Sequence, residues 1–157
     1  MSKLDKYLQI RERLDEFLVS YSPKLDKIGL MATLSSLVKS AFPSMVFVGF
    51  YLMKEIQGEK VLEIGPYQGD VLACGRIYLG DGVCGKAAQL KEIQLVPDVL
   101  EYPGYIACDS ETKSEIVLPV FQDSEVSAVF DLDHGELNYF DDTDKEHLQL
   151  LLTYIFN

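Results

Sequence analysis

Three cysteines are the most reactive side chains of this sequence, and each lies among small residues. Cys74, Cys84 and Cys108 stand in the segments LACG, GVCG and IACD. A cysteine kept for packing usually lies in an apolar run, where it acts as a small hydrophobic group, and none of these segments is such a run. Because the number of thiols is odd, at least one of them is free. The sequence therefore predicts thiol chemistry.

Cys84 follows Gly80-Asp81-Gly82, where a helix is expected to begin. Backbone N–H groups and the helix dipole at such a position favour a thiolate. The six residues 80–85 also match the glycine pattern of dinucleotide-binding loops. However, the expected helix is short and no second long crossover follows, as a dinucleotide fold would require. We interpret the glycines as a structural turn that needs positive φ angles and close backbone approach.

Carboxylates form the second chemical group. Asp131 and Asp133 flank Leu132 near the end of a predicted strand, so the period of two places both carboxylates on one face. Glu115 begins the preceding strand and reaches the same end of the sheet if the two strands pair as a hairpin. The two aspartates on one face suit Mg²⁺ binding or acid–base chemistry. We do not interpret them as a phosphatase-type D-x-D motif, because that motif usually stands at the beginning of a long domain. Since the cysteines lack C-x-x-C spacing and the two histidines lack H-x-x-x-H spacing, we expect no metal and no cofactor.

Composition narrows the class of protein. With 157 residues, of which 48% are hydrophobic, the chain suits a single domain spanning residues 1–157. The net charge is -11, and no cluster of lysine and arginine offsets it, so we expect no nucleic-acid partner and no membrane partner. No secretory signal or long apolar stretch is visible, and we expect a cytoplasmic protein.

Hydrophobic periodicity predicts two amphipathic helices, then strands with a short helical crossover, then a closing helix. This order is typical of an α+β domain. Asp141 is expected to cap the last helix with support from Asp144, residues 122–125 are expected to form a hairpin turn, and Gly65-Pro66 and Gly69-Asp70 are expected to form turns. The expected helices cover 4–21, 23–42, 83–90 and 141–155, and the expected strands cover 45–53, 60–64, 72–79, 93–96, 115–121 and 126–133.

Several motifs occur in a specific order: GVCG, the loop PGYIACD, the strand KSEIVLP and the strand end FDLD. In this combination the chain resembles the free methionine-(R)-sulfoxide reductases, a family built on a single GAF-type domain. The resemblance implies a central antiparallel sheet with the N-terminal and C-terminal helices packed on one face. It also implies that the chain reduces free methionine sulfoxide and is recycled by thioredoxin.

The same resemblance assigns roles to individual residues. Cys108 is expected to attack the sulfoxide, and Cys74 is its expected resolving partner, with Cys84 as a pocket residue or an alternative resolving thiol. Tyr51 is expected in the pocket wall, as is Phe47, which stands where the family often has tryptophan; this chain has none. The carboxylates expected to hold the substrate are Glu115, Asp131 and Asp133.

Two other functions remain open at this point. One is a GAF-type sensor that binds a small ligand without turning it over, and the other is a redox-sensing module whose cysteines switch a partner protein. Fold alone does not distinguish them from an enzyme. The apolar stripes on the first and last helices are also compatible with a homodimer.

Overall fold

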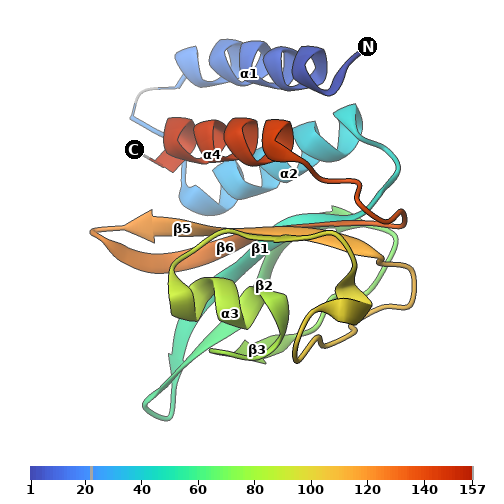
Figure 1. Cartoon of the computed structure of the whole chain (residues 1–157). Coiled ribbons are helices and arrows are strands. Elements are labelled where there is room, and N and C mark those ends of the chain that lie inside the picture. The colour runs from blue at the N-terminus through green and yellow to red at the C-terminus, as the bar shows by residue number, and fades with distance from the viewer. Residues whose placement is uncertain (22, 157) are drawn as a thin grey trace.

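A six-stranded antiparallel sheet forms the centre of the computed structural model, which describes residues 1–21 and 23–156 (Figure 1). The strands lie side by side in the order β3-β2-β1-β6-β5-β4, so the edges are formed by the two shortest strands. The strands are β1 (Met45–Ile56), β2 (Glu59–Gly69), β3 (Arg76–Tyr78), β4 (Gln94–Val96), β5 (Ser114–Gln122) and β6 (Glu125–His134).

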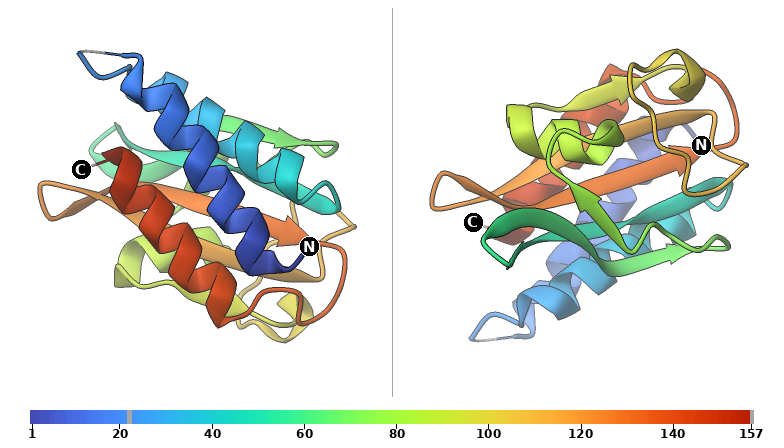
Figure 2. Two further views of the ribbon diagram at one scale, coloured as in Figure 1. Left: turned by 90° about the horizontal axis from the view of Figure 1, so that it is seen from above. Right: turned by 90° about the horizontal axis from the view of Figure 1, so that it is seen from below.

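Helices cover the two faces of the sheet unequally. Figure 1 shows α2 (Lys27–Ala41) and α4 (Asp142–Phe156) against one face, with α1 (Lys3–Val19) lying over both of them. The opposite face carries only the short α3 (Gly82–Leu90) and the loops around it, which include a 3-10 turn at Val99–Glu101 (Figure 2). The predicted α+β architecture, with the terminal helices on one face, is confirmed. No helix among the described residues has the length and apolar content needed to cross a bilayer.

Each face of the sheet has its own hydrophobic core. The larger core lies under α1, α2 and α4 and contains the stacked rings of Phe50 and Phe130, whose centroids are 4.3 Å apart. The smaller core lies under α3 and includes Cys84. Side chains alternate between these cores along β1 and β6 because successive residues of a strand point to opposite faces. The chemistry-bearing residues of β5 and β6 point toward the smaller core.

The two hairpin turns have backbone conformations of the same kind. Asp123 and Ser124 have φ angles of 51° and 66°, and Gln57 and Gly58 have φ angles of 52° and 81°. Positive φ at both central residues matches the twist of antiparallel strands in two-residue hairpins. The predicted turn between β5 and β6 is thus confirmed, whereas the turn at Gln57-Gly58 was not predicted.

Strand β2 differs from the sequence expectation because it runs through Gly65-Pro66 instead of turning there. The pairing of β1 with β2 shifts between Gly49 and Tyr51, where one residue of β1 faces two residues of β2. Such a bulge leaves one residue outside the hydrogen-bond ladder, which suits proline because it has no N–H to donate. The second helix also differs: it begins at Lys27 with Asp26 as its cap, later than Pro23 indicates.

The predicted strand at 72–79 is mostly wrong. Only Arg76–Tyr78 pairs with β2, and Leu72 is 84% exposed. Residues 71–75 leave the sheet and pass over its α3 face, so Cys74 lies in a loop and not on a strand. Alternation alone could not reveal this, because it does not say whether a neighbouring strand is there to pair with.

A buried carboxylate joins the two ends of the chain. Asp144 is fully buried and accepts hydrogen bonds from the Tyr7 hydroxyl at 2.8 Å and from the Lys3 ammonium at 2.5 Å. It also accepts the backbone N–H of Asp141, whose own carboxylate accepts the N–H of Thr143. The predicted cap of the last helix is therefore confirmed, and the same residue fixes α1 on α4.

Replacing Asp144 with alanine should lower the free energy of unfolding by about 2–4 kcal/mol, because it leaves the buried Tyr7 hydroxyl without its acceptor and removes one of the acceptors of the Lys3 ammonium. Urea denaturation followed by circular dichroism measures the change. Asp142→Ala, at an exposed position of the same turn, is the matched control and should cost less than about 1 kcal/mol. Equal losses in the two variants would contradict this role of Asp144.

Candidate active site

Three carboxyl groups lie together on the α3 face of the sheet. Glu115 on β5 pairs directly with Asp133 on β6, and Asp131 lies two residues earlier on the same face of β6. All three are buried, with exposed fractions of 6%, 8% and 4% for Glu115, Asp133 and Asp131. The sequence expectation that Glu115 approaches the two aspartates is confirmed by this register.

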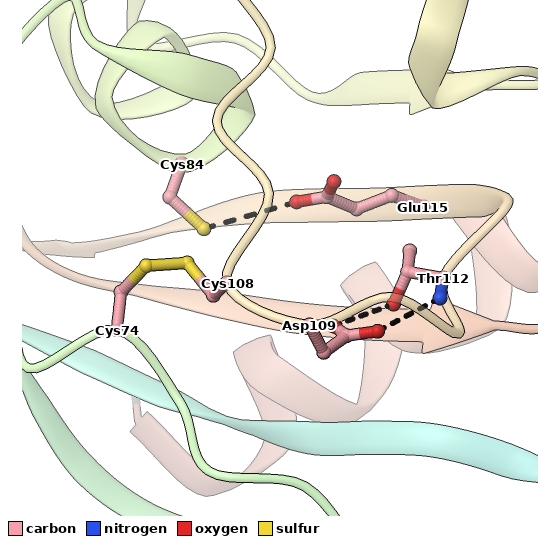
Figure 3. The surroundings of a disulfide bond; sticks show 6 residues. All are labelled: Cys74, Cys84, Cys108, Asp109, Thr112 and Glu115. Carbon is pink, nitrogen blue, oxygen red and sulfur yellow. Dashed lines mark hydrogen bonds between the residues drawn. A yellow bond between two sulfur atoms is a disulfide. The ribbon is translucent and has the colours of Figure 1, made fainter.

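The buried Cys84 thiol faces these carboxyl groups from the first turn of α3. Its Sγ lies 4.0 Å from Oε1 of Glu115 (Figure 3). The next residue, Gly85, has no Cβ, which lets the first turn of α3 pack against the end of β3: a Cβ there would lie 2.4 Å from the carbonyl oxygen of Tyr78. Gly80 closes the turn by donating its N–H to the Gly85 carbonyl at 2.9 Å. The glycine pattern therefore serves close packing, as the sequence analysis expects.

A disulfide joins Cys74 to Cys108 at the mouth of the same site, with Cα atoms 5.2 Å apart (Figure 3). Cys74 comes from the loop before β3, and Cys108 comes from the loop after β4. The residue carrying the Cys108 thiol is exposed, whereas Cys84 is buried and free. Two of the three predicted thiols are thus within bonding reach, and the third lies beneath them against the carboxyl groups.

Asp109 holds the loop that carries Cys108. Its Oδ1 accepts the backbone N–H of Glu111 at 2.7 Å. The same Oδ1 accepts the backbone N–H of Thr112 at 2.8 Å, and Oδ2 accepts the Thr112 hydroxyl at 2.9 Å (Figure 3). Sequence reasoning missed this residue. The available signal was an aspartate followed by small polar residues, which often forms a local side-chain turn of this kind.

Burial dominates the electrostatics of the carboxyl cluster. Desolvation, followed by repulsion from neighbouring carboxylates, raises the pKa of Glu115 and of Asp133 well above the ordinary range. Burial raises the pKa of Asp131 to about 7, although hydrogen bonds from Cys84 and Glu115 oppose the shift. The protonated forms of Glu115 and Asp133 are therefore favoured, and Asp131 is divided between its two forms near pH 7.

The expected thiolate at Cys84 is not supported. Burial, followed by the nearby Asp131, Glu115 and Asp133, raises the pKa of the Cys84 thiol well above its ordinary value. The helix-dipole argument fails because a dipole contributes at most about 2 kcal/mol, less than desolvation beside acidic groups. Cys84 keeps its proton at neutral pH.

A cavity of about 40 Å³ separates the disulfide from the carboxyl cluster. Phe47 and Tyr51, both predicted pocket residues, form one wall, with ring centroids 6.1 Å apart. Oδ1 of Asp131 and Oδ1 of Asp133 are buried and have no hydrogen-bond partner within the described part of the chain. Further lining residues that were not predicted to line the pocket are Val71, Leu72, Ala73, Ile77, Asp81, Gly82, Val83, Tyr105, Ile106 and Asp109.

The arrangement also has a set of atoms that can hold a cation. One donor atom each from Cys84, Glu115 and Asp131 lies within 4.8 Å of the others. The sequence did not predict this donor set, because the spacing rules for metal ligands apply to residues close together in the chain. These three residues come from three separate elements, α3, β5 and β6.

Asp133→Asn should stabilise the protein at pH 8 by about 1–3 kcal/mol, which raises the melting temperature by about 2–4 °C per kcal/mol. Because the pKa of Asp133 is raised in the folded protein, its contribution to stability is present below pH ~4 and is lost as the pH rises through the folded pKa. The gain in the variant should therefore vanish near pH 4.

Thermal melts of both proteins at the two pH values provide the measurement. Glu111→Gln, which removes an exposed carboxylate, is the control and should change little at either pH. A variant gain that does not depend on pH would show that Asp133 is not a strained carboxyl group.

Known proteins resemble this chain in both sequence and fold. A family model described as a GAF domain matches residues 30–155. The free methionine-R-sulfoxide reductase of Saccharomyces cerevisiae is 42% identical, over 94% of this chain and 86% of the relative, and that of Escherichia coli is 34% identical, over 82% and 74%. The structure of the Neisseria meningitidis enzyme in complex with its substrate has a TM-score of 0.89 at 34% identity, covering 99% of this chain and 89% of that one. The chain belongs to the GAF-domain family of free methionine-R-sulfoxide reductases.

Proposed function

We propose that this protein reduces free methionine-(R)-sulfoxide to methionine, using its own cysteines as the reductant. The observation that carries the proposal is the Cys74–Cys108 disulfide at the mouth of a cavity whose floor is made of buried carboxyl groups. Sulfoxide reduction needs a soft nucleophile for sulfur and a proton for the departing oxygen. The relatives in this family are named for the same reaction.

The unpartnered carboxylate oxygens account for recognition of a free amino acid. Oδ1 of Asp131 and Oδ1 of Asp133 are buried without a hydrogen-bond donor, and leaving such atoms unpaired is costly. A substrate ammonium supplies a positive charge and several N–H donors, whereas a peptide-bound residue offers a single uncharged amide N–H. Phe47 and Tyr51 supply the apolar wall for the methyl and methylene groups.

In the chemical step, we assign the role of nucleophile to Cys108. Its thiolate attacks the sulfoxide sulfur and forms an S–S bond to it. The oxygen then moves to the Cys108 sulfur as a hydroxyl, the S–S bond and the substrate S–O bond break, and the products are a sulfenic acid on Cys108 and methionine as a thioether. The substrate sulfur gains two electrons, and the cysteine sulfur loses two. Glu115, whose pKa is raised by burial and by the neighbouring aspartates, donates the proton to oxygen.

In the step that follows, we assign the role of resolving thiol to Cys74. Its sulfur attacks the sulfenic acid, water leaves, and the Cys74–Cys108 bond of this structure results. One sulfoxide and two thiols thus give one thioether, one disulfide and one water. Cys84, whose thiol keeps its proton, shapes the pocket. A thioredoxin-type dithiol then reopens the disulfide from the exposed Cys108 side.

Homodimer formation stays a prediction. Leu4 and Leu8 on α1 and Leu150 on α4 are 45%, 49% and 42% exposed. Both helices lie on the side of the sheet opposite α3 and run side by side in Figure 2. Sedimentation velocity tests this directly.

Single turnovers without an external reductant should separate the cysteine roles. Cys108→Ser should release no methionine from methionine-(R)-sulfoxide, because the attacking sulfur is gone. Cys74→Ser should release one methionine per chain and then stop, even when thioredoxin and its reductase are added. Released methionine is counted by chromatography after mixing with each epimer.

Cys84→Ser is the matched control and should still form the disulfide and turn over with thioredoxin. Methionine release by Cys108→Ser would remove the assignment of the nucleophile. Steady cycling of Cys74→Ser would transfer the resolving role to Cys84.

Asp131→Asn should lower kcat/KM for the free amino acid by about tenfold to a hundredfold at pH 8, because a charged hydrogen bond to the ammonium is lost. In the unaltered protein, kcat/KM should fall as the pH drops below about 7, where Asp131 becomes protonated. N-acetyl-methionine-(R)-sulfoxide, which has no ammonium, should be a poor substrate whose kcat/KM changes little on the substitution. Equal loss for both substrates would contradict ammonium binding by Asp131.

A further inference from the structure

One thiol and two carboxyl groups converge at the floor of the cavity from three separate elements. The donor atoms of Cys84 on α3, Glu115 on β5 and Asp131 on β6 all lie within 4.8 Å of one another. Metal–ligand bonds are about 2.0–2.3 Å long, so atoms this close together can share one coordination sphere once the side chains adjust around an ion. The residues are buried at the end of a cavity that reaches them from the disulfide side.

A second observation indicates that this cluster lacks a positively charged ligand. Oδ1 of Asp131 and Oδ1 of Asp133 are buried and without a hydrogen-bond donor among the described residues. Neither side chain is more than 8% exposed, so bulk water does not solvate these atoms freely. The cavity volume of about 40 Å³ has room for a cation with a bound water.

The types of donor determine which cation fits. Mg²⁺ demands octahedral oxygen coordination and binds thiols poorly. Zn²⁺ and Co²⁺ accept a mixture of one thiolate and carboxylate oxygens in a tetrahedral arrangement. Cys84, Glu115 and Asp131 supply three such donors, which leaves one position of a tetrahedral site for a further ligand.

We propose that Cys84, Glu115 and Asp131 form a binding site for Zn²⁺, with Asp133 beside the fourth position. Binding deprotonates the Cys84 thiol and the carboxyl groups, and these protons pass to solvent without any change of oxidation state. The site occupies the space assigned above to the substrate ammonium. The cation and the amino acid therefore exclude each other; this second part rests on the proposed function, and cation binding itself does not.

The disulfide form of the protein allows a clean test, because Cys84 is then the one free thiol. Titration with Co²⁺ should produce the near-ultraviolet charge-transfer band of a Co²⁺–thiolate bond, and Zn²⁺ should abolish it. Cys84→Ser should remove the band and weaken Zn²⁺ binding, measured by calorimetry, at least tenfold. Mg²⁺ in large excess should not displace Co²⁺.

Two further variants complete the test of cation binding. Asp131→Asn should weaken Zn²⁺ binding at least tenfold while its circular dichroism spectrum and disulfide are retained. Asp98→Asn, which alters a carboxylate outside the cavity, is the matched control and should bind Zn²⁺ normally. A band that persists in Cys84→Ser, or no Co²⁺ binding by the folded disulfide form, would overturn the site.

Competition is measured in the double variant Cys74→Ser Cys108→Ser, whose single thiol is again Cys84 and which cannot consume the substrate. Methionine-(R)-sulfoxide should displace Co²⁺ from this protein. Co²⁺ binding that the amino acid leaves unchanged would overturn mutual exclusion while keeping the cation site. Absence of reductase activity in the unaltered protein would instead count against the proposed function and would leave the Co²⁺ result as it stands.

Discussion

The crowding of three carboxyl groups and a thiol in one desolvated space is the constraint on which the rest of the site depends. Acidic groups this close together cannot all ionise, so some of them keep their protons and the repulsion between negative charges is reduced. The register of β5 on β6 places Glu115 directly opposite Asp133, and the missing side chain at Gly85 lets the first turn of α3, which carries Cys84, pack against the end of β3. The cluster is unfavourable for folding by itself, and the apolar cores on both faces of the sheet offset its cost.

Local patterns in the sequence predicted the elements whose signals are local. The cap formed by Asp141 and Asp144 and the turn at Asp123-Ser124 depend on residues a few positions apart, and both are present. The path of β2 through Pro66 and the departure of Cys74 from the sheet were not predictable in this way. Both depend on which strand lies alongside, and a pattern of alternating side chains does not contain that information.

The same difference between local and long-range signals explains which parts of the site were predicted. The carboxylates were found because a period of two and a hairpin are enough to bring Glu115 to Asp131 and Asp133. The protonation of Cys84 was not found, because it depends on burial by residues 31 or more positions away, such as Glu115. The shared donor set of Cys84, Glu115 and Asp131 escaped notice for the same reason, since no spacing rule applies to ligands from three different elements.

The Cys74–Cys108 bond has a mechanical consequence as well. Cys74 precedes β3 at one edge of the sheet, and Cys108 follows β4 at the other edge, so the bond ties the two borders of the curled sheet together across its α3 face. The bond closes a loop between residues 34 positions apart in the sequence. The resulting loss of entropy in the unfolded chain stabilises the folded protein by about 4 kcal/mol. The disulfide form of the protein should therefore resist heat and proteases better than the reduced form. The stability of the fold thus depends on the redox state of the same bond that the reaction forms and reduction breaks.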